Sequence, residues 1–251
     1  MKKKHSLKSH PFVQTLKSTV DPYFAEEIRQ VLLKAKSTNA PTPWLNSRRR
    51  IRKVEPYQVN VSRATGQMEA VVKNLKLSLF LIRRYPTIEL SSDNALSHMQ
   101  WIDYHYSSFI TSYASAYETA LQLTNYVFEL GIPETKCRND VVRDNSHVKG
   151  TGVYAALKQL EALVASYRPS RHAFIHRGEQ TPIEEIFRNS MDRFIRVQTN
   201  PKIKPGPLNQ IFSRRLVGKV CKRLNADVRS LELALCQLLD SSFLIYQSRV
   251  K

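Results

Sequence analysis

Glycine and cysteine are both scarce in this chain. Only seven of the 251 residues are glycine, which argues against a turn-rich β sandwich or barrel, and most of them lie between long periodic segments, as connectors between helices would. The three cysteines, Cys137, Cys221 and Cys236, are an odd number without the short spacing of a disulfide framework or a zinc site. Because Cys221 and Cys236 fall within helical apolar patterns, we expect reduced core residues of a cytoplasmic protein.

Long apolar runs are also missing. Every uninterrupted apolar stretch is far shorter than the roughly 20 residues that a membrane-spanning helix needs. The basic start Met1-Lys2-Lys3-Lys4 is not followed by the apolar segment of a signal peptide. We therefore expect a soluble protein without a membrane partner. The sequence has no glycine-rich phosphate loop, no dinucleotide fingerprint and no Ser-His-Asp ordering cue, so we expect no cofactor.

Acidic residues are few relative to basic ones. The chain has 39 Lys and Arg against 21 Asp and Glu, a formal net charge of +18 and an isoelectric point near 10.0. A field of this sign favours polyanions such as RNA, DNA or an anionic membrane surface, although a protein can also be basic without such a partner. The cationic run over residues 48–53 is open to the same two interpretations, a phosphate grip or a solvated loop.

Apolar residues recur at helical spacing over long stretches. Between residues 99 and 130 ten positions follow an uninterrupted three–four spacing, typical of a long bundle helix, and Gly131 then ends it. The same spacing recurs over residues 153–167 and 217–245. The ten positions of the first stretch are Met99, Ile102, Tyr106, Phe109, Tyr113, Ala116, Ala120, Leu123, Val127 and Leu130.

Weaker signals complete the expected secondary structure. A short helix is predicted over residues 21–36, and further helices over 66–84 and 181–198. Asp21 and Thr181 are the expected N-caps, and a Pro-rich linker is predicted over residues 199–207. Residues 57–61 alternate like one short strand, and the first 20 residues are expected to be loosely ordered.

These segments predict an all-α protein, an antiparallel up-and-down helical bundle with two long helices. We assign residues 1–64 to a basic N-terminal extension with one short helix, and residues 65–251 to the bundle domain.

One residue breaks the helical pattern. The apolar stripe that reaches Tyr167 continues at Arg171 before it returns to an apolar residue at Phe174. An arginine in line with a core stripe is costly unless it faces a partner, an anion or a water-filled cleft. Such local violations tend to mark functional places. His176 follows Arg171 after four intervening residues.

This arginine and histidine, placed after a long bundle helix, resemble the Arg-x4-6-His signature of the HEPN superfamily, all-α proteins that include many metal-independent ribonucleases. The resemblance covers about residues 65–250 and is strongest from Trp101 to Glu179. His172 stands where many members carry Asn or Asp. The resemblance implies a homodimer in which two copies of the motif line one composite cleft, and an endoribonuclease that serves as a toxin or in defence against phage, with an antitoxin or regulatory partner.

The residue types fit cleavage of RNA without a metal. Such a reaction needs a group that moves a proton of the 2′-hydroxyl or leaving group, and a cation for the charge that develops on the phosphate. Histidine, with an ordinary pKa of about 6.5, suits the first task and is assigned to His176. The forked guanidinium of Arg171 suits the second. We assign Arg168, His172 and Arg177 to substrate binding.

Other interpretations of these residues remain open. Arg171 could pair with an acid such as Glu179, while His176 caps a helix end. His172 and His176 have a zinc-type i, i+4 spacing, but Ala173 stands where the His-Glu-x-x-His motif has Glu and no third ligand is evident, so we predict no metal. The alternative functions are a non-catalytic member of the same fold that binds nucleic acid or a nucleotide, and a dimeric helical scaffold.

Overall fold

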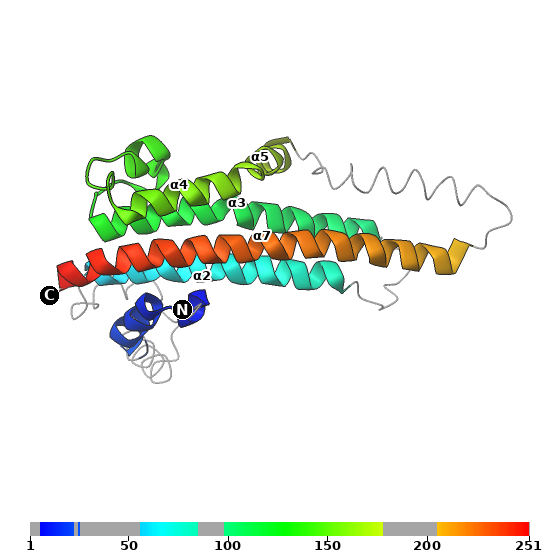
Figure 1. Ribbon diagram of the computed structural model, residues 1–251, viewed down its shortest axis with the longest axis horizontal. Helices are drawn as coiled ribbons and strands as arrows, with labels where there is room; N and C mark the ends of the chain where they lie inside the picture. The colour runs from blue at the N-terminus through cyan, green and yellow to red at the C-terminus, as the bar shows by residue number, and fades with distance from the viewer. Residues whose placement is uncertain (1–5, 23–24, 26–55, 85–97, 178–204, 251) are drawn as a thin grey trace, which may run out of the picture. The chain divides into compact units, whose positions relative to one another are not determined.

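In the part of the chain that it describes, the computed structural model consists of helices joined by turns and contains no strand, which confirms the predicted all-α class (Figure 1). It describes residues 6–22, 25, 56–84, 98–177 and 205–250, without the side chains of residues 98–100, 176–177 and 205–216. A helical segment over residues 11–22 follows the first turn. The named elements are η1 (Leu7–Ser9), α2 (Pro56–Arg83), α3 (His98–Phe128), η3 (Glu134–Lys136), η4 (Asn139–Arg143), α4 (Gly152–Ala165), α5 (Arg168–Arg177) and α7 (Pro205–Val250).

The helices form two compact units, each assembled from segments that are distant in the sequence. Unit 1 consists of Met1–Glu69, Glu118–Lys158 and Ala234–Lys251, and unit 2 of Ala70–Tyr117 and Gln159–Leu233. Helices α2, α3, α4 and α7 each contribute one part to each unit, whereas α5 belongs to unit 2 alone.

The helical segment 11–22 packs its apolar face against α7 in unit 1. The ring of Phe12 is fully buried. It stacks on Phe243 of α7 at a centroid distance of 5.2 Å and packs at a tilt against Tyr246 at 5.1 Å. His10 Nδ1 accepts a hydrogen bond from the backbone N–H of Phe12, so its Nε2 is the nitrogen that donates to Asp240 Oδ1 at 3.0 Å. His10 and Phe12 thereby attach this segment to α7.

The core of unit 2 consists of the apolar stripes of α2, α3, α4 and α7. Trp101 of α3 donates its indole N–H to Leu81 O of α2 at 2.8 Å, and Lys76 of α2 pairs with Glu232 of α7 at 3.0 Å. The fully or nearly fully buried side chains include Leu75, Ile82, Ile102, Phe109, Ile110, Tyr113, Leu160, Val164, Leu224 and Leu231.

The predicted stripes of α3, α4 and α7 are confirmed wherever side chains are described, with few departures. On α3 the eight stripe positions from Ile102 to Val127 are buried. The stripe positions from Val153 on α4 to Tyr167, just beyond its end, are buried as well. Leu130, beyond the end of α3, is only half-buried. The cysteines are free thiols; Cys221 is buried, as expected, and Cys236 is partly exposed.

Three local predictions are wrong. Residues 57–61 are not a strand but part of α2, which begins at Pro56 and is a third long helix. Residues 11–20 are helical rather than loose, so Asp21 lies inside a helix instead of capping one. The last residues of the predicted linker, 205–207, already belong to α7.

Other predictions fall outside the described residues. These are the cationic run 48–53, nearly all of the helix beyond residue 22, the helix over 181–198 and the rest of the linker. The division into an extension (1–64) and a bundle domain (65–251) stays a prediction. Among the described residues, no helix is long and apolar enough to cross a membrane.

Two glycines of unit 1 differ in the space around them, which leads to opposite expected effects of alanine. At Gly66, within α2, an added Cβ meets no atom within 4 Å, so Gly66→Ala should raise the free energy of unfolding by about 1 kcal/mol through helix propensity. At Gly152 the Cβ would lie 2.8 Å from Ser241 Oγ and 3.3 Å from Ser241 Cβ, so Gly152→Ala should be destabilising. Urea unfolding of both variants tests this, and equal gains would contradict it.

Candidate functional site

Helix α5 carries all five residues that the sequence assigns to the site. It has ten residues, among them three arginines and two histidines. A two-residue break at Ser166 and Tyr167 separates it from α4, and it begins at Arg168 with Pro169 in its first turn (Figure 1). Proline is favoured in the first turn, where its missing N–H has no partner to lose.

The break places Arg171 and His176 on a helix of their own. The backbone N–H of Arg171 donates to Tyr167 O at 3.0 Å, so the first turn of α5 is built on Tyr167. On a regular helix, a step of five residues places Arg171 and His176 about 140° apart around the axis. Arg171 is half-buried and His172 exposed. The side chains of His176 and Arg177 lie outside the described part of the chain, so a meeting of Arg171 and His176 stays a prediction.

Arg168 already has neighbours within unit 2. Its Nη1 lies 3.7 Å from Glu161 Oε1 on α4, and its guanidinium carbon is 5.1 Å from the centroid of the Tyr117 ring on α3. Both partners of the ion pair reach solvent, and such pairs are worth about 0–1 kcal/mol. A phosphate group could therefore compete with Glu161 for this arginine.

Tyr167 anchors the start of α5 to α7. Its ring is buried and lies 4.5 Å from the ring centroid of Tyr113 and 6.1 Å from that of Phe109. Its hydroxyl donates to Asp227 Oδ2 at 2.6 Å. Burial, followed by the hydrogen bond to Asp227 and the charge of that residue, raises the pKa of Tyr167, so its hydroxyl stays protonated and keeps donating.

Further polar groups from α3 and α7 surround Asp227. The hydroxyl of Tyr113 donates to the backbone oxygen of Asp227 at 3.3 Å. Partial burial opposes the charged form of Arg223, but the hydrogen bond with Tyr167 and the neighbouring Tyr106 and Asp227 raise the pKa of Arg223 overall. Together these residues form a network, which we call the Tyr167–Asp227 anchor.

The sequence interpretation missed the Tyr167–Asp227 anchor. Tyr106 and Tyr113 were expected to be core residues, and both are buried, whereas Tyr104 is 71% exposed. The available signal was the pair Arg223 and Asp227, two charged residues at an i, i+4 spacing beside the apolar stripe of α7. Their partner Tyr167, just before α5, could not be predicted from that spacing.

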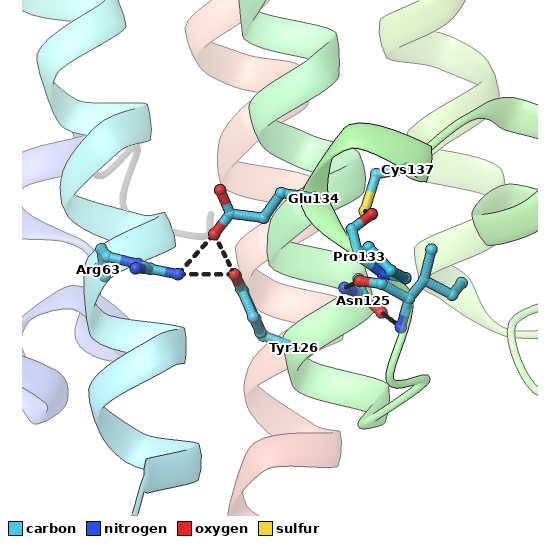
Figure 2. A network of polar contacts seen from close by, with 7 residues as sticks. Arg63, Asn125, Tyr126, Pro133, Glu134 and Cys137 are labelled. Carbon is cyan, nitrogen blue, oxygen red and sulfur yellow. Dashed lines mark hydrogen bonds and ion pairs between the residues drawn. The ribbon is translucent and has the colours of Figure 1, made fainter.

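A second polar network lies in unit 1 and is drawn in Figure 2. Arg63 Nη2 of α2 donates to Tyr126 OH at 2.7 Å and pairs with Glu134, which also accepts a hydrogen bond from Tyr126. The Asn125 side chain makes a two-way pairing with the backbone of Ile132, at 2.7 and 3.1 Å. These contacts fasten the turn after α3 to α2, and since each charge has a partner we regard the network as structural.

His105, in unit 2, is a buried histidine outside the predicted site. Its ring makes edge contacts with Trp101 and Tyr104 at 4.4 and 5.2 Å, and its buried Nε2 forms no hydrogen bond within the described residues. Burial lowers the pKa of His105 from the ordinary histidine value. Protonation therefore favours the unfolded chain, in which the pKa is higher.

Because burial lowers the pKa of His105, we expect the stability of the fold to depend on pH. The contribution of His105 is fully present above about pH 6.5 and is lost as the pH falls through that value toward the lower pKa of the folded state. His105→Gln should weaken the fall of the urea midpoint between about pH 7.5 and about pH 5.5. His147→Gln is the matched control, because His147 is exposed. Equal pH dependence in both variants would exclude this role of His105.

In the part of the chain that is described, no group of three or more His, Cys, Asp or Glu side chains is arranged to hold a metal ion. The i, i+4 pair of His172 and His176 includes one side chain outside that part.

These observations define a class of protein, an all-α bundle in which a short basic helix with an Arg-x4-His motif follows a bundle helix. The HEPN_Cthe2314-like HEPN family model matches residues 64–231, more than half of the chain, and the chain belongs to this family. The resemblance to the HEPN superfamily that the motif indicates is thereby confirmed. Comparison with curated proteins and with solved structures gave no match.

Proposed function

We propose that this protein is a metal-independent endoribonuclease whose site is built on α5. The observation that carries the proposal is the concentration of Arg168, Arg171, His172, His176 and Arg177 on a ten-residue helix whose start is held by a buried tyrosine. Membership of the HEPN family, in which ribonucleases are common, and the net charge of +18 support an RNA substrate.

The proposed reaction is an internal transfer at one phosphodiester. The 2′-hydroxyl oxygen attacks the adjacent phosphorus as its proton is removed, and the bond from phosphorus to the 5′-oxygen breaks. The products are a 2′,3′-cyclic phosphate and a 5′-hydroxyl, so no water is consumed and no electron changes hands. His176 carries the proton, and Arg171 stabilises the charge that builds on the non-bridging oxygens.

A homodimer would complete the site. Two apolar side chains of α5, Phe174 and Ile175, are 38% and 48% exposed, although they adjoin the charged residues of the motif. An exposed apolar pair of this kind is consistent with cover by a second copy, which would bring a second motif beside the first. We propose that such an enzyme acts as a toxin or in phage defence and is held in check by an antitoxin or regulatory partner.

The test is cleavage of RNA in the presence of EDTA. The full chain should cut single-stranded RNA with EDTA in excess and leave 2′,3′-cyclic phosphate ends, detected by their resistance to a phosphatase that removes simple phosphate ends. Binding without cleavage would favour the non-catalytic alternative. A dimer with no more RNA affinity than other proteins of equal charge would favour the scaffold.

A further inference from the structure

A groove on unit 2 is lined by residues of α2 and α7 and lies apart from α5. Its volume is about 660 Å³, within the range of about 300–1,000 Å³ typical of small-ligand sites. Its cationic side chains are Arg83, Lys222 and Arg229, and no acidic residue lines it among the residues described.

Among the described residues, no acidic side chain lines the groove to balance its positive charge. Lys222 and Arg229 form no ion pair with any residue in the described ranges, and Arg83 contacts the sulfur of Cys221. Three like charges around one hollow repel one another, and an anion bound between them would relieve that repulsion. Phosphate is the anion that arginine and lysine side chains suit best in nucleic-acid recognition.

The floor of the groove is apolar and open. Ile82 and Cys221 are almost fully buried beneath it and Val217 is buried beside them. Gly218 has no side chain, and an added Cβ there would meet no atom within 4 Å. Apolar side chains beside three cations suit a nucleotide unit, with its base on the apolar side chains and its phosphates on the cations. A base is free to take that place in a single strand, whereas a duplex hides its bases in the stack.

The groove and the Tyr167–Asp227 anchor occupy different flanks of α7. Asn225 and Arg229, which line the groove, each lie two residues from Asp227 and therefore about 160° from it around the helix axis. The groove is thus not an extension of the α5 site, and it can be altered without touching the residues that hold α5.

We propose that this groove binds the phosphate backbone of single-stranded RNA, as a docking site that holds the substrate away from the scissile bond. The proposal rests on the proposed function for the identity of the substrate, but it concerns binding rather than cleavage. Docking at a second place would anchor a flexible strand and raise its effective concentration at α5.

The test compares two triple variants that each remove three positive charges. Arg83→Gln/Lys222→Gln/Arg229→Gln alters the groove. Lys73→Gln/Arg84→Gln/Lys219→Gln alters exposed residues outside it, on α2, directly after α2 and on α7. All six side chains are exposed, so we expect folding to be preserved, and circular dichroism checks this. Affinity is measured by fluorescence anisotropy, at several salt concentrations, with a 2′-O-methyl oligoribonucleotide that lacks the attacking hydroxyl.

The groove variant should bind RNA at least about tenfold more weakly than the control variant. The slope of log K against log salt should become shallower by about 0.7 for each phosphate that the protein no longer neutralises, hence by up to about 2, and should change much less in the control. Gly218→Leu, which fills the groove without changing charge, should also weaken binding. Equally weakened binding in the two triple variants, or no RNA binding by the wild-type chain, would overturn the docking site.

Two further comparisons distinguish this docking site from a site for free nucleotides and from the proposed nuclease activity. If a nucleoside triphosphate binds the wild-type chain but not the groove variant, while both bind RNA equally, the groove serves a free nucleotide and the RNA proposal is wrong. If groove-dependent RNA binding is found but cleavable RNA stays intact, the nuclease proposal fails and the docking site stands. If RNA is cleaved but neither its binding nor its cleavage depends on the groove, the docking site fails and the nuclease proposal stands.

Discussion

Arg171→Ala and His176→Ala should each reduce the rate of RNA cleavage by about 10²–10⁴-fold. His176 is proposed to carry the proton of the attacking or leaving oxygen, and Arg171 to stabilise the charge on the phosphate. Because the two residues would act on one transition state, the double variant should be little worse than either single one. The measurement is the initial rate on a short RNA, in EDTA, at saturating and at low substrate concentration.

Matched controls remove an arginine or a histidine elsewhere. Arg138 and His147 are exposed residues of unit 1, and Arg138→Ala and His147→Ala should cleave at the wild-type rate. Arg171 is half-buried, so the unfolding free energy of Arg171→Ala must be measured alongside its activity. A folded Arg171→Ala or His176→Ala protein that cleaves as fast as the two controls would exclude α5 as the active site.

The same two variants test the composite cleft. If Arg171 of one subunit works with His176 of the other, a mixture of the two inactive proteins regains one intact site in each mixed dimer. With random pairing the expected recovery is roughly a quarter of the wild-type activity. If each cleft needs both copies of both residues, or if each subunit works alone, the mixture stays inactive.

Most of the fold could be predicted from local periodicity, and α2 shows where that failed. Val61, Ala64, Met68, Val72 and Leu75 form one continuous buried stripe at helical spacing. The sequence predicts this helix only from residue 66 onward, because residues 57–61 alternate like a strand and Ala64 is only weakly apolar. A long-range contact supports the helical form there: Tyr57 OH donates to Val127 O of α3 at 3.3 Å.

The site shows the same division between local and distant information. Arg171 was found because it stands on an apolar stripe, a violation visible within a few turns of helix. The hydrogen bond between Tyr167 and Asp227 joins residues 60 positions apart, and no periodicity in the sequence indicates it. Its existence depends on how α5 and α7 pack, which no single segment specifies.

Removal of the Tyr167 hydroxyl is therefore the sharpest test of how α5 is held. Tyr167→Phe keeps the ring that packs on Tyr113 and Phe109 but deletes the donor to Asp227. A hydrogen bond to a carboxylate is worth about 1.5–3 kcal/mol, and that is the expected decrease in the free energy of unfolding. The start of α5 would also be freed to move, and a displacement of about 1 Å in a catalytic group can cost about 10²-fold in rate.

Tyr113→Phe is the matched control, because it deletes the other tyrosine hydroxyl that donates to Asp227 but leaves α5 attached. Both variants should unfold more easily. Only Tyr167→Phe should speed hydrogen exchange of the amides of residues 168–177 and lower kcat for RNA cleavage, with KM little changed. The exchange result does not depend on the nuclease proposal. Equal exchange in the two variants would mean that packing of the Tyr167 ring, and not its bond to Asp227, positions Arg171.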